Sequence, residues 1–104
     1  LITINQEELK RFNITTGDTE GLVNYGLSIE GIRFAVLIID RGKLVKMSFR
    51  SKSDFAVNEF AEEYFHGGGH KNAAGGQSEE SLEDTVAKFK KVIKGYQNQL
   101  LSIK

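Results

Sequence analysis

The chain has 104 residues, a length typical of one domain, and its 14 basic and 14 acidic side chains cancel, so no overall field draws nucleic acid to it. It contains no cysteine, which excludes disulfides and thiolate metal sites. No apolar run approaches the ~18 residues of a membrane-spanning helix and no signal peptide is visible, so a cytoplasmic setting without a membrane partner fits best.

Two short helices are predicted near the start of the chain. Asn5 can cap a helix over residues 6–11, because Glu8 stands at the third helical position of a capping box. Asp18 can cap a second helix over residues 19–24, and we expect Leu22 and Val23 to anchor it to the core.

A β-hairpin is predicted next. Residues 32–39 form an almost continuous apolar run, which is typical of a strand buried on both faces. Residues 40–43 read as a tight turn in which Gly42 can take a positive φ. Residues 44–51 alternate, so the side chains on the core side should be Val45, Met47 and Phe49.

The hairpin also carries a run of positive charge. Between positions 41 and 52 there are five cations and no acid, namely Arg41, Lys43, Lys46, Arg50 and Lys52. Such a run is usually a solvated face. For the first three cations the sequence leaves that reading and a ligand-binding one equally open.

A helix over residues 57–65 follows, because apolar side chains recur at helical spacing and end where a glycine run begins. Phe60 and Tyr64 on its apolar face fit core packing better than base stacking. Residues 73–77 predict a short strand. Ser81 then caps a long C-terminal helix, with Asp84 at the third helical position and an apolar stripe that extends to Leu100. The predicted fold is therefore α/β, a small mixed β-sheet with helices packed on it.

The segment Phe65–Gly76 is the most informative stretch. It holds five glycines, and glycine weakens regular elements, so we expect a loop with outward amide groups that suit a phosphate. A flexible connector is the alternative. His70 and the small residues Ala73 and Ala74 argue against it, because a plain linker needs neither.

Other chemistry is less well supported. His66 and His70 are four apart, the spacing of a helical zinc pair, but three glycines between them disfavour a helix and only Glu62 or Glu63 could be a third ligand. We therefore expect no metal site, and we interpret His66 as a surface or packing residue. No nucleophile motif accompanies the serines. A phosphate site fits better, since Arg50 offers a bidentate fork and Ser51 a hydroxyl.

The run Gly67-Gly68-Gly69-His70-x-x-Ala73-Ala74-Gly75 resembles the hallmark of the DHH-associated C-terminal domain of the Asp-His-His phosphoesterases. That superfamily includes RecJ-type exonucleases, nanoRNases that also hydrolyse 3′-phosphoadenosine 5′-phosphate, cyclic-dinucleotide phosphodiesterases and exopolyphosphatase-related proteins. Residues 18–24 and 48–52 agree with it, and the order of all three segments is most similar to the bacterial nanoRNase branch. The resemblance spans residues 2–96.

The resemblance implies a division of labour. Two Mn²⁺ ions would sit in a separate N-terminal domain that carries the Asp-His-His triplet, which this chain lacks. Because the chain also begins at Leu1 without a Met, we expect a substrate-binding fragment, inactive alone, of a phosphodiesterase whose missing part holds the metals. Carried over, the substrate-binding residues would be Arg50, Ser51, Gly67, Gly68, Gly69 and His70, with Lys52 and Asn72 as weaker candidates. His70 could also assist catalysis.

Short RNA or a related nucleotide phosphoester would be the substrate, and the resemblance also allows a homodimer. One alternative belongs to another class: a related domain in alanyl-tRNA synthetases is a non-catalytic RNA-binding and dimerising module. The His-x-x-Ala-Ala-Gly ending and the Arg50–Ser51 pair favour the phosphoesterase branch. A ligand-free interaction domain is the third reading.

Overall fold

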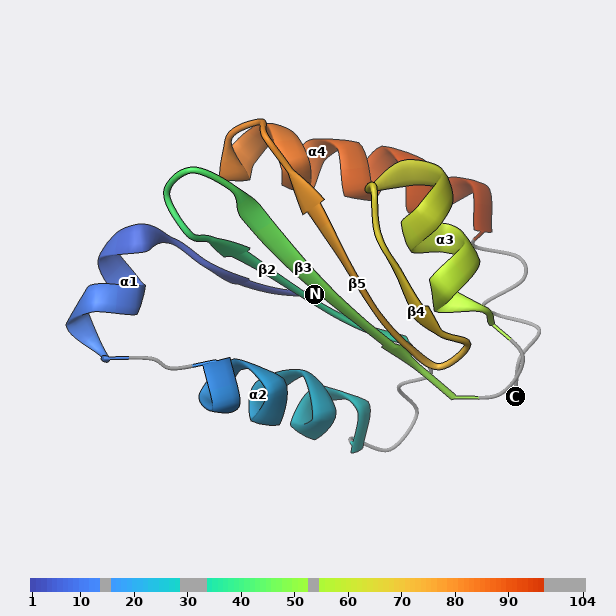
Figure 1. The fold of residues 1–104 in the computed structure, drawn as a ribbon, viewed down its shortest axis with the longest axis horizontal. Coiled ribbons are helices and arrows are strands. Elements are labelled where there is room, and N and C mark those ends of the chain that lie inside the picture. The colour runs from blue at the N-terminus through green and yellow to red at the C-terminus, as the bar shows by residue number, and fades with distance from the viewer. Residues whose placement is uncertain (14–15, 29–33, 53–54, 97–104) are drawn as a thin grey trace.

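The structure, a computed structural model, describes residues 1–13, 16–28, 34–52 and 55–96. The elements in chain order are β1 (Ile2–Ile4), α1 (Gln6–Arg11), α2 (Thr16–Ser28), β2 (Phe34–Asp40), β3 (Val45–Ser51), α3 (Val57–Tyr64), β4 (Gly68–His70), β5 (Ala73–Ser78), α4 (Leu82–Ile93) and a 3-10 turn (Lys94–Tyr96). The strands form one sheet in the order β1-β2-β3-β5-β4, with β1 parallel to β2 and the other neighbours antiparallel. Helices α3 and α4 lie on one side of it and α2 on the other (Figure 1). The predicted α/β class, a mixed sheet with helices packed on it, is confirmed.

Strand β2 is apolar from Phe34 to Ile39 because it contributes to two cores. Val36 and Ile38 belong to the larger cluster under α3 and α4. Leu37 and Ile39 belong to a smaller cluster that contains Val23 of α2. Since successive side chains of a strand alternate between faces, a run without polar interruptions is what two buried faces require.

The larger core is built on phenylalanine. Four of these rings are exposed by 2% or less: Phe49, Phe55, Phe60 and Phe65. The rings of Phe49 and Phe60 meet edge to face, with centroids 5.6 Å apart at 71°. Phe89 adds a ring from α4, 6.1 Å from that of Phe60. Edge-to-face contacts add ~0.5–1.5 kcal/mol per pair to the burial energy, so this cluster holds both helices on the sheet.

The capping residues in the sequence correctly predict where α1 and α4 begin. The capping box of α1 is present, with the Glu8 amide donating to Asn5 Oδ1 at 2.8 Å and the Asn5 amide donating to Glu8 Oε1 at 3.0 Å. Ser81 Oγ caps α4 by accepting from the Asp84 amide at 3.1 Å. Among the described residues, no helix is long and apolar enough to cross a membrane.

The second helix departs from the prediction. It begins at Thr16 and ends at Ser28, well beyond the expected residues 19–24. Val23 is fully buried, but Leu22 is 37% exposed, so Leu22 as an anchor is wrong. One residue along a helix is a rotation of about 100°, which turns Leu22 away from the sheet that Val23 contacts. Two parts of the predictions lie outside the described residues, namely residues 32 and 33 of the expected strand and Leu100 of the expected stripe.

Two strands were not predicted. Ile2–Ile4 is too short to show a pattern, and it pairs in parallel with residues 37–39 of β2. The glycine run was expected to be a loop, yet Gly68–His70 form the edge strand β4. Antiparallel pairing with β5 across a two-residue turn holds them there, which outweighs the weak strand preference of glycine.

Candidate substrate-binding site

The face of β3, β5 and β4 opposite α3 and α4 is only partly covered, and we call it the open face. The ladder sets its side chains in three rows across the strands, because paired residues in antiparallel strands point to the same face. From the hairpin end to the other end of the sheet, the rows are Lys46–Gln77, Ser48–Gly75 and Arg50–Ala73, and Gly68 and His70 of the edge strand are the ladder partners of Gly75 and Ala73. The two outer rows each carry a cation, and the middle row is uncharged.

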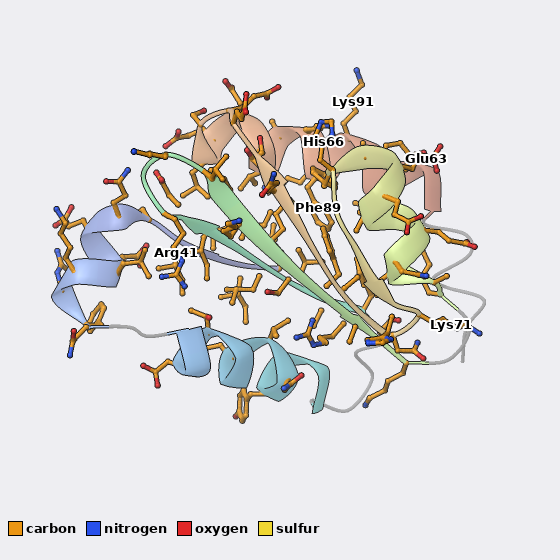
Figure 2. The ribbon with its side chains drawn as sticks, viewed as in Figure 1. Arg41, Glu63, His66, Lys71, Phe89 and Lys91 are labelled. Carbon is orange, nitrogen blue, oxygen red and sulfur yellow. The ribbon has the colours of Figure 1, made fainter. Side chains whose placement is uncertain are left out.

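A groove of about 610 Å³ lies on the hairpin side of the open face. Thr19 of α2 and Arg41 of the hairpin turn border one side, and His66 borders the other. In Figure 2, Arg41 reaches from the turn into the space between α1 and α2, while His66 lies beside the end of α3. Among the described residues, no carboxylate lines this groove. Its polar lining therefore suits an anion or a neutral polar ligand.

The floor of the groove exists because Gly75 has no side chain. A Cβ placed on Gly75 would meet the carbonyl oxygen of Met47 at 3.4 Å and project into the groove. The neighbouring Gly76 faces the phenylalanine core, where a Cβ would stand 2.9 Å from Phe65 Cβ. Packing thus requires glycine at position 76. At position 75 it leaves a hollow that a ligand can fill.

The predicted cradle of outward amides does not form as expected. The amide of Gly67 donates to the carbonyl of Ala61 at 3.1 Å and helps to end α3. Gly68 and His70 are the directly bonded partners of Gly75 and Ala73, so only the N–H of Gly69, within β4, points to the free edge of the sheet. Glu62 of α3 lies beside Gly68, with Oε1 3.7 Å from where a Cβ would stand. Glycine here therefore shapes a surface, and anion contacts must come from side chains.

Arg50 and His70 are both ladder partners of Ala73, one on each side of β5. Both hydrogen bonds of the guanidinium use Nη1, which donates to the carbonyls of Phe49 at 2.9 Å and Ala74 at 3.4 Å. These bonds hold the half-buried side chain between β3 and β5 and leave Nη2 and Nε for a ligand. His70 is exposed two strands away. The structure thus aligns Arg50 with His70, rather than with the middle of the glycine run.

Ser51 is not placed beside Arg50 as predicted. It is 4% exposed and, as the neighbour of Arg50 on a strand, faces the opposite side. Its hydroxyl donates to the carbonyl of Phe55 at 2.7 Å and accepts from Asn72 Nδ2 at 2.9 Å. Together with the Ser51 amide, which donates to the Asn72 carbonyl at 3.0 Å, these bonds tie the β4–β5 turn to the end of β3. Ser51 and Asn72 therefore hold the β4–β5 turn and the end of β3 together. Lys52 is exposed beyond β3.

The two histidines do not form a metal pair. His66 takes φ +48° and ends α3, whereas His70 belongs to β4. Among the described residues, no three histidine, cysteine, aspartate or glutamate side chains gather as a metal site would need. The donor set of this part of the chain does not fit a two-manganese centre.

Sequence reasoning left part of the groove open. For Lys46, a solvated position and a ligand-binding one were equally open, and the alternation along β3 places it on the same face as Arg50. Nothing in the sequence brought Gln77, Thr19 or Arg41 to the same groove, because each comes from a different element and only the sheet order unites them.

The comparisons agree with this architecture. The chain belongs to the DHHA1 domain family, whose model matches residues 3–98, and the resemblance carried by the glycine motif is confirmed. The domain is thus of the DHH-associated kind found in DHH-family phosphoesterases.

Solved structures from two bacteria are among those similar to it. An exopolyphosphatase-related protein from Bacteroides fragilis matches with a TM-score of 0.88 and 35% identity, over 96% of this chain and 29% of that chain. An uncharacterized protein from Helicobacter pylori G27 matches with a TM-score of 0.59 and 22% identity, over 88% of this chain and 25% of that chain, and shows the fold alone. This chain therefore spans less than a third of either one. Among curated proteins, none matches significantly.

Proposed function

We propose that this domain is the substrate-binding part of a DHH-family phosphoesterase, and that it holds a nucleotide phosphoester on the open face. The observation that carries the proposal is the pairing around Ala73, whose ladder partners are Arg50 and His70, beside a floor without side chains. Arg50 would bind the phosphate, and His70 would donate a further hydrogen bond to it. The nucleoside would lie over Gly75.

The energetics of this arrangement favour binding. The two bonds from Nη1 fix the guanidinium, so less rotamer freedom is lost when a ligand binds. A charge-assisted hydrogen bond to phosphate contributes on the order of 1.5–3 kcal/mol. The small Ala73 between the two side chains lets a phosphate approach the sheet closely.

Cleavage would take place elsewhere in the full protein. The two Mn²⁺ ions implied by the family would be held by a separate domain with the Asp-His-His residues. The part of this chain that the structure describes would bind and orient the substrate. A relative described as exopolyphosphatase-related is compatible with phosphoester or phosphoanhydride substrates. The neutral middle row supports a nucleotide.

Titration of the ¹⁵N-labelled chain with adenosine 5′-monophosphate tests the proposal. We expect saturable shift changes at Arg50, His70 and Gly75, and Arg50→Ala should weaken binding roughly ten- to a hundredfold. Arg50→Lys should recover part of the loss, because lysine keeps the charge without the planar fork. Lys90→Ala on α4, at an exposed position of a helix on the other side of the sheet, is the control and should change nothing. Shift changes confined to α4, or no saturation at millimolar ligand, would overturn the proposal.

A further inference from the structure

Gln77 of β5 offers the groove a side-chain amide of fixed polarity. It is partly buried, pairs with Lys46 of β3 in the ladder, and lines the groove with it. Lys46 Nζ donates to Gln77 Oε1 at 3.1 Å. Because an ammonium can only donate, the amide atom that faces Lys46 must be the oxygen, and Nε2 lies on the other side of the amide group. Within the described residues Nε2 has no hydrogen-bond partner, so both of its N–H groups remain for a ligand.

The charged groups at this end of the groove are also donors. Arg41 and Lys46 are exposed and line it. Asp40 adjoins Arg41 in sequence, but its ladder partner is the core residue Val45, so its carboxylate projects to the opposite face. The hydroxyl and imidazole groups that also line the groove can either donate or accept. In the described part of the chain, the hairpin end therefore presents fixed donors without a fixed acceptor, and it requires acceptors from a ligand.

A single nucleotide can extend from Arg50 to this end. The guanidinium of Arg50 donates to the carbonyls of Phe49 and Ala74, which lie about one residue closer to the hairpin than Arg50 itself. About three residues of β3 then separate the guanidinium from Lys46, roughly 10 Å at the rise of a strand. A phosphate at the guanidinium and a sugar over Gly75 leave the outer edge of the base at the row of Lys46.

The bases differ in what they present to such donors. Guanine has two neighbouring acceptors, N7 and O6, whereas adenine has N7 beside the N6 amino donor and cytosine has the N4 amino donor. A donor that faces an amino group leaves both groups without a partner, which costs binding energy. Gln77 Nε2 and Lys46 Nζ are two neighbouring donors, and they match the guanine edge.

We infer that Gln77, oriented by Lys46, is a specificity-determining residue that makes the domain prefer guanine nucleotides. The inference rests on the proposed function, in which Arg50 holds the phosphate. Gln77 Nε2 and Lys46 Nζ donate to O6 and N7 of the base. A pair of donors that matches a base edge discriminates against the wrong base by roughly five- to 150-fold.

Isothermal titration with guanosine and adenosine 5′-monophosphates tests the inference, and 7-deazaguanosine 5′-monophosphate, which lacks the N7 acceptor, is the third ligand. We expect the guanosine nucleotide to bind at least about fivefold more tightly than the adenosine nucleotide, and the 7-deaza analogue to have an intermediate affinity. Gln77→Glu keeps an oxygen toward Lys46 but replaces Nε2 with a second acceptor, so it should abolish or reverse the preference. The nucleotides carry equal charge, so the added negative charge cancels in the ratio of their affinities.

Three further variants make the ratio interpretable. Gln77→Ala removes the donor without adding charge, should bring the ratio close to one, and replaces Gln77→Glu if that variant does not fold. Lys43→Gln also changes the charge by one unit, at an exposed cation of the same hairpin that does not line the groove, and should leave the ratio unchanged. Arg50→Lys should weaken both nucleotides to the same extent, because Arg50 contacts the phosphate that they share.

The outcomes separate base selection from phosphate binding. Equal affinity for the two nucleotides, or a preference for adenosine monophosphate, would overturn the inference and leave the proposed function standing. So would a guanine preference that both Gln77 variants retain, or a 7-deaza analogue that binds as tightly as guanosine monophosphate. A preference lost in Lys43→Gln would show that general charge sets it, which also overturns the role of Gln77. If neither nucleotide binds the unmodified chain, the proposed function fails, and base selection fails with it.

Discussion

Two adjacent glycines of β5 should respond in opposite ways to the same substitution. In Gly76→Ala the new methyl would stand 2.9 Å from Phe65 Cβ, 3.1 Å from the Phe65 carbonyl oxygen and 3.2 Å from Phe49 Cε2. In Gly75→Ala it would have one neighbour, the Met47 carbonyl oxygen at 3.4 Å. Neither glycine has a positive φ, so an alanine fits the backbone at both positions.

The free energies of unfolding follow from these contacts. Overpacking costs about 1–3 kcal/mol, and the reduced freedom of the unfolded chain returns about 0.4–1 kcal/mol. Gly76→Ala should therefore lose about 1–2 kcal/mol, while Gly75→Ala should stay unchanged or gain up to about 1 kcal/mol. For a domain of this size, about 4–8 °C in Tm corresponds to each kcal/mol.

Thermal and urea unfolding followed by circular dichroism measure both changes. Binding of adenosine 5′-monophosphate completes the experiment, because Gly75→Ala puts a methyl on the floor of the groove and should weaken binding in a stable protein. Gly21→Ala is the control: a Cβ there meets nothing within 4 Å, and the change should leave binding unaltered. Equal destabilisation by the two β5 variants, or normal binding by Gly75→Ala, would refute the assignment of the two faces.

Three further substitutions distinguish residues that stabilise the fold from residues that contact the ligand. Ser51→Ala should cost about 1–3 kcal/mol in chemical denaturation, because the hydroxyl's hydrogen bonds to the Phe55 carbonyl and from Asn72 Nδ2 are both lost, yet it should leave nucleotide affinity per folded molecule unchanged; a selective loss of affinity would restore Ser51 as a ligand contact. His66→Gly should raise Tm, since a residue other than glycine at φ +48° costs about 1–2 kcal/mol, against about 0.5–1 kcal/mol of added freedom in the unfolded chain; a lower Tm contradicts this. His70→Ala should weaken nucleotide binding with a stability change within about 0.5 kcal/mol, as is usual at exposed positions; unfolding of this variant would make His70 a structural residue.

The features of the fold that depend on neighbouring residues could be predicted from the sequence. Caps at Asn5 and Ser81 are short-range hydrogen bonds, and the alternation from Val45 to Phe49 is a short-range pattern, so each could be predicted from neighbouring residues. The glycine motif indicated the family for the same reason, because its residues follow one another along the chain.

What could not be predicted depends on long-range pairing. The Gly68–His70 strand exists because β5 pairs with it, and its own residues favour no strand. The same pairing places Gly68 and His70 in hydrogen bonds with β5, so their amides, which were expected to bind phosphate, are already used. Ser51 was assigned to a ligand from its place beside Arg50 in the sequence, although neighbours on a strand face opposite sides. The groove itself joins five elements, α2 and the strands β2 to β5, through a sheet order that no local pattern encodes.

Because β5 lies between β3 and β4, hydrogen-bonded ladders hold its backbone on both sides. A floor made of such backbone has almost no conformational freedom to lose when a ligand arrives. The long side chains around the groove differ, because fixing each of them when a ligand binds costs about 0.5–1.5 kcal/mol of conformational entropy. Substitutions at Arg41 and Lys46, which line the groove, should therefore change its charge while the shape of the floor stays constant.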